Sequence, residues 1–146
     1  MASVQLALYR PHRPTDFGGR LVCWWTGSPY SHCELVVDGE CYSSSIRDGG
    51  VRKKVIALDP AHWDLIALPW VQASSVLLQF ARTKGQPYGW LDLVLRQVFN
   101  KRGDATGWYC SEWCAAALGL SRPQGYSPGD LADYCDYCSF GVDDAR

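Results

Sequence analysis

The chain has 146 residues, of which 47% are hydrophobic, and its 14 Lys and Arg against 15 Asp and Glu leave a formal net charge of -1. This size and apolar content suit one core, so we expect a single domain over residues 1–146. The balanced charge gives no general electrostatic reason to bind nucleic acid or an anionic membrane, so partners have to be inferred from a site.

The N-terminal sequence MASVQLALYRPHRP has an apolar stretch too short for a secretion signal and no basic segment before it. No later run is long enough to span a bilayer, so we expect a cytoplasmic protein without a signal peptide or transmembrane segment. The seven cysteines are an odd number, which with no signal favours reduced thiols over a disulfide framework. Each thiol is then a core residue, a metal ligand or a nucleophile.

Strands are expected to dominate the first half of the chain. Val4 to Tyr9 alternates loosely between apolar and other residues, which predicts a first strand. Asp16 can cap a helix from Phe17 to Trp25, although two glycines in that stretch leave a strand possible.

A β-hairpin is the clearest local signal. His32 to Val37 and Glu40 to Ser45 are separated by Asp38-Gly39, which fits the positive φ values of a two-residue hairpin turn. Two more strands are predicted from Val51 to Leu58 and from Leu65 to Trp70. This part of the chain is therefore expected to form an antiparallel meander.

Helices are expected after residue 73. Ser74 can cap a helix that continues to Thr83, and further helices are predicted from Gly89 to Phe99 and from Trp108 to Leu118. Ser127-Pro128-Gly129-Asp130 combines a capping side chain, a proline at the first helical position and an acid in the first turn, which predicts one more short helix. Strands followed by helices indicate an α+β fold.

Cys110 and His32 are the candidate catalytic pair. A thiol attacks as the thiolate, which a helix N-terminus and a nearby imidazole both favour. Cys110 opens the helix predicted in WYCSEWCAAALG, whereas Cys114 lies one turn deeper and is expected to pack against the sheet. His32 begins a strand and has a fixed direction, while His12 and His62 lie near turns.

The segments SPYSHCELVVDG and CYSSS resemble the histidine hairpin of circularly permuted NlpC-type papain-like cysteine hydrolases, including the YiiX-like group, and YCSEWCAAAL resembles their later cysteine helix. The permuted group, to which lecithin retinol acyltransferase is related, also places histidine before cysteine. GRLVCWWTGSPYSH, GQPYGW and YSPGDLADY extend the resemblance over most of the chain. The resemblance implies a papain-like antiparallel sheet with helices packed on it and the catalytic cysteine at a helix N-terminus.

The resemblance also implies an activity, because relatives cleave peptide amides in cell-wall material or transfer and hydrolyse acyl groups on lipids. We expect a cysteine hydrolase or acyltransferase acting on an amide, ester or thioester carbonyl, with an amidase or peptidase preferred. His32 would deprotonate Cys110, helix-terminal amides would hold the oxyanion, and no metal or cofactor is required. The alternative is a non-catalytic structural or binding protein that keeps the scaffold, for example in a phage particle, which would make it virion-associated.

The group that orients His32 has two candidates. In the predicted hairpin register Ser45 faces His32 and is the first choice, while Glu34 shares the face of His32 two residues along and is the second. Relatives place a histidine, asparagine, glutamine or acid on the following strand, and the three serines at 43–45 depart from that pattern. Aromatic residues expected to line a substrate cleft are Tyr30, Trp108 and Tyr109, the last being equally well explained as a core residue.

Two further patterns have a functional and a structural interpretation. Cys135 and Cys138 have the spacing of half a zinc site, which Cys110 and Cys114 would complete if the helix and the tail met, although ordinary thiols are the default. The basic residues at 52–54 lie on a predicted strand and are interpreted as a solvated edge rather than a binding patch.

Overall fold

The structure is a computed structural model that describes residues 2–89 and 107–143. Of the helix predicted from Gly89 to Phe99, all but the first residue lies outside the described residues.

One antiparallel sheet forms the centre of the described structure, with the strand order β4-β3-β2-β1-β5. Its strands are β1 (Val4–Tyr9), β2 (His32–Val37), β3 (Glu40–Ser45), β4 (Gly50–Lys54) and β5 (Trp63–Ala67).

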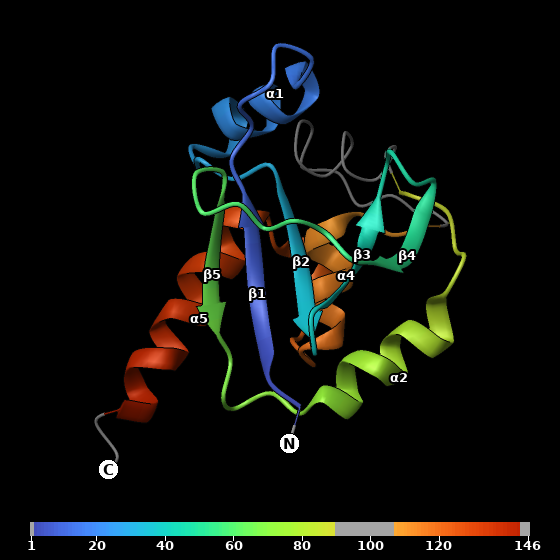
Figure 1. Cartoon of the computed structure of the whole chain (residues 1–146), viewed down its shortest axis with the longest axis vertical. Coiled ribbons are helices and arrows are strands. Elements are labelled where there is room, and N and C mark those ends of the chain that lie inside the picture. Colours follow the sequence, from blue (N-terminus) through green and yellow to red (C-terminus); the bar gives the residue numbers. More distant parts are fainter. Residues whose placement is uncertain (1, 90–106, 144–146) are drawn as a thin grey trace.

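Most helices lie on one face of this sheet. Figure 1 shows α4 (Cys110–Ala117) and α5 (Pro128–Asp143) behind the strands, with α2 (Ala73–Thr83) beside the β4 edge. The helix α1 (Phe17–Thr26) stands beyond one end of the sheet, and the short 3-10 helix η1 (Pro123–Gly125) connects α4 to α5. The expected α+β class is therefore confirmed.

The predicted hairpin is present and has the expected register. Asp38 and Gly39 have φ values of 50° and 80°, and Val37 pairs with Glu40. The β2–β3 ladder stops after the pair Leu35 and Tyr42. From Cys41 to Ser45 β3 pairs with β4, and from Ser43 onward β4 is its only ladder partner among the described residues. The first half of β2 therefore has no ladder partner on its β3 side.

Side chains of β2 alternate between two packed faces. Cys33, Leu35 and Val37 face the helices and join the main core, which includes Trp113 of α4 and Leu131 of α5. Val36 lies on the opposite face, where a smaller apolar cluster is covered by the segment that follows β4. The two faces of the sheet are thus both protected, but by different kinds of structure.

The strand predicted from Val51 to Leu58 ends earlier, at Lys54. The next strand, β5, lies at the opposite edge of the sheet, so the chain leaves β4 and crosses the sheet face to reach it (Figure 1). Ile56 and Leu58 are apolar because they cover that face, not because they belong to a strand. The predicted strand from Leu65 to Trp70 is likewise shifted, since β5 occupies Trp63–Ala67.

The predicted helices that fall within the described residues are present, but some of their end signals differ. The Asp16 side chain makes no capping bond to α1, and α2 begins at Ala73, one residue before the predicted cap Ser74. At α5 the capping residues do act as predicted, because the Asp130 N–H donates to Ser127 Oγ at 3.1 Å and the Ser127 N–H donates to Asp130 Oδ2 at 3.0 Å. This helix is 16 residues long rather than short. None of the described helices combines the length and apolar content needed to cross a bilayer.

Candidate active site

Cys110 is the first residue of α4, as predicted, and is 5% exposed. The preceding residue, Tyr109, makes no side-chain cap, and the first backbone bond of the helix runs from the Trp113 N–H to the Tyr109 carbonyl. The amides of the first turn therefore precede the regular helical bonds and carry the partial positive charge of a helix N-terminus. This position favours a negatively charged sulfur.

The Cys110 sulfur contacts the unpaired part of β2. The thiol and the backbone of Cys33 both lower the pKa of the Cys110 thiol, which places Cys33 beside it. The Cys33 carbonyl accepts a bond of 2.8 Å from the Ser43 hydroxyl. Side chains thus satisfy backbone groups of β2 that the shortened β2–β3 ladder leaves unpaired.

The serines of β3 fix the start of α4. Ser44 Oγ donates a 2.6 Å hydrogen bond to the carbonyl of Trp108, two residues before Cys110. Ser43 and Ser44 are both fully buried. The serine-rich segment, which departs from the pattern of the resembled family, therefore attaches the helix N-terminus to the sheet.

His32, the first residue of β2, contacts both Cys110 and a carboxylate. Its Nε2 lies 2.7 Å from Glu34 Oε1, and the pKa of its side chain responds to Cys110 on the other side. Because Nε2 is taken by Glu34, Nδ1 is the ring nitrogen left for the thiol. The structure thus brings together the two residues of the predicted pair, with 22% of the His32 side chain exposed.

The charges of this pair are mutually stabilised. Burial disfavours the imidazolium, but the charge of Cys110 and the hydrogen bonds with Cys110 and Glu34 outweigh it and raise the pKa of His32 to about 10. The bond from the Cys33 thiol, followed by the charge of His32, holds the pKa of Cys110 well below its usual range despite burial. The arrangement therefore favours a thiolate–imidazolium pair, which is the reactive form of a cysteine nucleophile.

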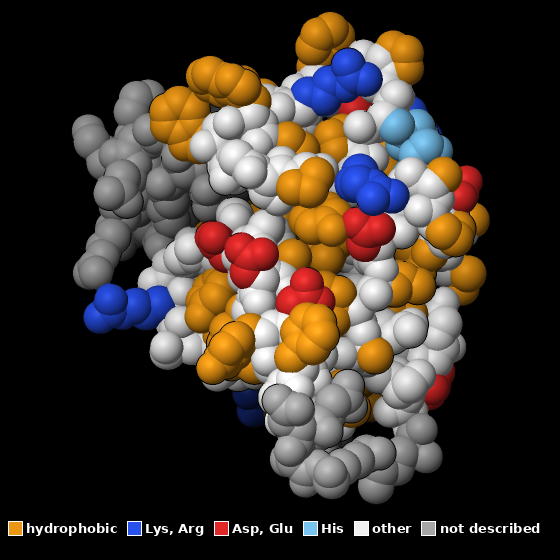
Figure 2. All heavy atoms as spheres, turned by 90° about the vertical axis from the view of Figure 1, so that its left-hand side faces the viewer, with side chains coloured by type: hydrophobic (Ala, Val, Ile, Leu, Met, Phe, Trp, Pro, Cys, Tyr) orange, Lys and Arg blue, Asp and Glu red, His pale blue; other side chains and the backbone are white. Residues whose placement is uncertain are grey.

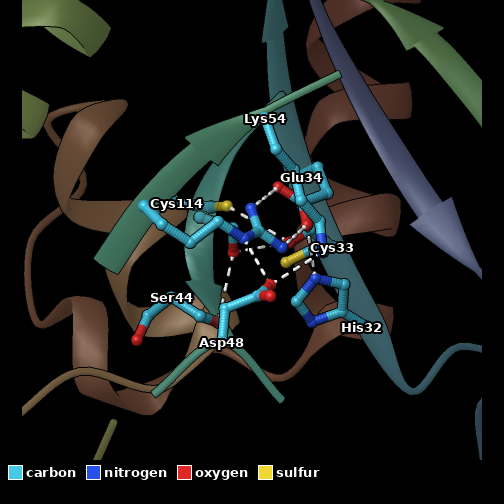
Figure 3. Close-up of polar contacts among 9 residues, drawn as sticks. His32, Cys33, Glu34, Ser44, Asp48, Lys54 and Cys114 are labelled. Carbon is cyan, nitrogen blue, oxygen red and sulfur yellow. Dashed lines mark hydrogen bonds and ion pairs between the residues drawn. The ribbon is translucent and has the colours of Figure 1, made fainter. Parts of the chain in front are cut away.

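Glu34 is the orienting group that the structure places on the imidazole. Its side chain is fully buried, and Arg52 of β4 binds both carboxylate oxygens, with Nη1 2.7 Å from Oε2 and Nη2 2.5 Å from Oε1. Burial opposes ionisation of Glu34, but the bonds from Arg52 and His32 lower its pKa below the usual range. Figure 3 shows His32 and Glu34 projecting from the same strand toward one another, with Asp48 nearby.

Ser45, the first choice for this role, lies elsewhere. Ser45 pairs with Gly50 of β4, beyond the point where β3 leaves β2. The register count that placed it opposite His32 holds only as far as Tyr42. The second choice, Glu34, is therefore the group at the imidazole.

Arg52 is the residue that sequence reasoning missed. It was interpreted with its neighbours as part of a solvated edge, but its side chain is only 14% exposed and also bonds to Asp48 at 2.7 Å. Alternation along β4 separates it from Lys53, whose side chain is 48% exposed. In the sheet Arg52 pairs with Ser43, which would face Glu34 if the hairpin register continued, so its position depends on a β3–β4 pairing that the sequence pattern does not give.

The three aromatic residues expected to line a cleft have different environments. Tyr109 is fully buried and donates its hydroxyl to the carbonyl of Gln124, so it is a core residue rather than a cleft wall. Trp108 is half-buried and donates its indole N–H to Gln86 at 2.6 Å. Tyr30 is half-buried and donates to Asp64 at 2.6 Å.

Two other aromatic residues lie closer to the pair than expected. The Trp63 ring is edge-on to the His32 ring, with 6.5 Å between the ring centroids. Burial, followed by the charge of Cys110, raises the pKa of Tyr88. Neither was predicted, because each reaches the site from a segment distant in sequence.

Among the residues that the structure describes, no group of three or more His, Cys, Asp and Glu side chains is arranged to hold a metal ion. Cys135 is buried in the main core, and Cys138 is half-buried on the same helix. Both are free thiols.

Comparison of the chain with protein-family models returned no match, and neither did the comparisons with curated proteins and with solved structures. The case for a function therefore depends on the geometry of the site.

Proposed function

We propose that this protein is a papain-like cysteine hydrolase or acyltransferase with the permuted order of its catalytic residues, acting on an amide, ester or thioester carbonyl. The observation that carries the proposal is the grouping of Cys110, His32 and Glu34, in which the thiol lies at a helix N-terminus and the imidazole is hydrogen-bonded to the carboxylate. A nucleophile, a base and an orienting carboxylate are the three groups that such chemistry needs. An amidase or peptidase is the preferred activity.

The proposed reaction begins with the Cys110 thiolate. Its sulfur forms a bond to the substrate carbonyl carbon, and the resulting oxyanion is stabilised by the amides of the first turn of α4. The imidazolium of His32 gives its proton to the leaving group as the bond to the carbonyl carbon breaks, which leaves an acyl-thioester on Cys110. His32 then takes a proton from water or an alcohol, whose oxygen displaces the thiolate.

Glu34 and Arg52 have a positioning role in this proposal. The Glu34 carboxylate fixes the imidazole through Nε2 and stabilises its positive charge, while Arg52 holds the carboxylate in place through two bonds. Fixing one ring nitrogen leaves the other directed at the thiol, so no rotation of the ring is needed before proton transfer.

One observation favours the alternative, a non-catalytic protein that keeps the scaffold. Cys110 is only 5% exposed, and its sulfur lies against Cys33 of the strand β2. A thiol with a purely structural role would have these same contacts. The two functions differ in whether the sulfur reacts with a reagent that enters from solvent.

Alkylation by iodoacetamide at mildly acidic pH tests the proposal. Cys23 and Cys138, the half-buried thiols, are first replaced by serine so that they do not react with the reagent. At about pH 6 an ordinary thiol is less than about one per cent ionised, so only a thiol with a depressed pKa reacts quickly. We expect modification at Cys110, identified by peptide mass spectrometry, and a rate at least about tenfold lower in His32→Ala.

Cys110→Ala is the control for site identity, and Ser45→Ala is the matched control for the orienting group. Ser45→Ala is expected to keep the rate, whereas Glu34→Gln is expected to lower it. Slow modification of several cysteines, independent of His32, would remove the case for an enzyme and favour the scaffold.

A further inference from the structure

The helix α1 has an unpartnered apolar stripe. None of its residues is buried, and the exposed fractions are 79% for Phe17, 62% for Leu21, 74% for Trp24 and 48% for Trp25. The spacing of these residues places them on one side of a helix. Two tryptophans and a phenylalanine exposed together on one short helix indicate an interaction surface.

The opposite side of α1 is attached to the rest of the protein. Gly19 lies against Ser31, where an added Cβ would come within 3.0 Å of the hydroxyl. The stripe of Phe17, Leu21, Trp24 and Trp25 therefore points away from the sheet. Figure 1 shows α1 beyond the end of the strands, and Figure 2 shows apolar side chains with basic ones among them at this same end.

The charge around the stripe is positive although the whole chain is not. Arg13 and Arg20 lie in or next to α1, whereas the charge of nearby Arg10 is balanced by Asp64 at 3.1 Å. From residue 10 to residue 31 Asp16 is the single acid. Asp16 is buried and paired with Arg47 at 2.7 Å, so its charge is neutralised. The guanidinium groups of Arg13 and Arg20 are on exposed residues.

We propose that the stripe of α1 inserts into the interfacial region of a lipid bilayer that contains anionic lipids. Trp, Phe and Leu on one side of a helix with arginines beside them are typical of helices that lie in this region, and guanidinium groups bind lipid phosphates. The net charge of the chain gives no general reason to bind such a membrane, but the positive charge beside α1 gives a local electrostatic attraction to it.

A bilayer fits this surface better than a protein partner does. A helix of ten residues is about 15 Å long and about 10 Å wide. The area that one side of it offers is therefore much smaller than the about 800 Å² that each partner buries in a standard protein interface. The stripe is also convex, and convex apolar groups can enter a fluid surface without a complementary groove. The proposal does not depend on the activity of the Cys110 site.

Co-sedimentation of the full chain with vesicles tests the proposal. Vesicles of phosphatidylcholine alone are compared with vesicles that also contain phosphatidylserine, at low and high salt. We expect binding to the anionic vesicles that salt weakens, and at least about tenfold weaker binding for the double variant Leu21→Ser with Trp24→Ser. The matched control is Tyr137→Ser with Phe140→Ser on α5, where the side chains are 82% and 74% exposed, and it is expected to bind normally.

Either a failure of the vesicle test or evidence of a dimer would overturn the proposal. The first is no sedimentation of the unmodified chain with anionic vesicles, or equal binding by the α1 double variant when circular dichroism shows that both are folded. The other is a concentration-dependent dimer in light scattering that the α1 double variant abolishes, without vesicle binding, because a second copy of the chain would then cover the stripe.

Discussion

At the scale of single residues, the carboxylate of Glu34 is the group on which the charges of the site depend. It is fully buried, and its two partners are His32 and Arg52. A buried anion is tolerated only when it is paired, and here one carboxylate serves two cations. The buried Glu34 carboxylate is therefore unfavourable by itself, and it is stabilised at the position where it orients His32.

Replacing Arg52 by methionine is expected to destabilise the protein by about 3 to 5 kcal/mol, because the Glu34 carboxylate would then be buried with only the imidazole as a partner. Urea denaturation measures this difference in the free energy of unfolding. Lys53→Met on the same strand is the control, and since the Lys53 side chain is 48% exposed its effect is expected to be small. Equal effects of the two substitutions would show that Arg52 does not support Glu34.

At the scale of elements, a buried carboxylate anchors the segment that leads into α1. Asp16 accepts bonds from the Tyr9 hydroxyl at 2.8 Å and from the Arg13 N–H at 3.0 Å, and it pairs with Arg47. Burial alone would raise its pKa, but these bonds hold the pKa at about 2, below the usual 3.8. The acid that was expected to cap α1 thus organises the turn before it.

Asp16→Asn is expected to lower the free energy of unfolding by about 2 kcal/mol at neutral pH. Because the pKa of Asp16 is lower in the folded state, its contribution is present above about pH 4 and is lost as the pH falls toward 2. Thermal or urea unfolding at several pH values measures this. The two proteins are expected to converge in stability at about pH 2, and a constant difference across that range would contradict the assignment.

At the scale of the whole molecule, local sequence signals predicted individual strands and helices but not which of them contact one another. Asp38-Gly39 was enough to predict the hairpin, because few residue pairs adopt two positive φ values, and Ser127 with Asp130 was enough to predict the start of α5. The departure of β3 from β2 has no local signal. At that place Cys110 of α4 lies beside Cys33, and only the fold brings those segments together.

The same reason explains which site residues were predicted. Cys110 and His32 each have a local feature, a helix start and a strand start, and the family resemblance supplied their pairing. Arg52 acts from a third strand, so its role depends on the order of strands in the sheet, which the sequence pattern alone does not give. Ser45 was misplaced because its role assumed a ladder that stops three residues earlier.

The central claim is that Cys110 is a thiolate paired with the His32 imidazolium across most of the pH range. The ultraviolet absorbance of the thiolate, recorded as the difference between the unmodified chain and Cys110→Ala during a pH titration, tests it most directly. We expect the midpoint of Cys110 ionisation to lie well below the ordinary thiol value of about 8.5 and to rise toward that value in His32→Ala. A midpoint at or above the ordinary value, or one that His32→Ala leaves unchanged, would contradict the account.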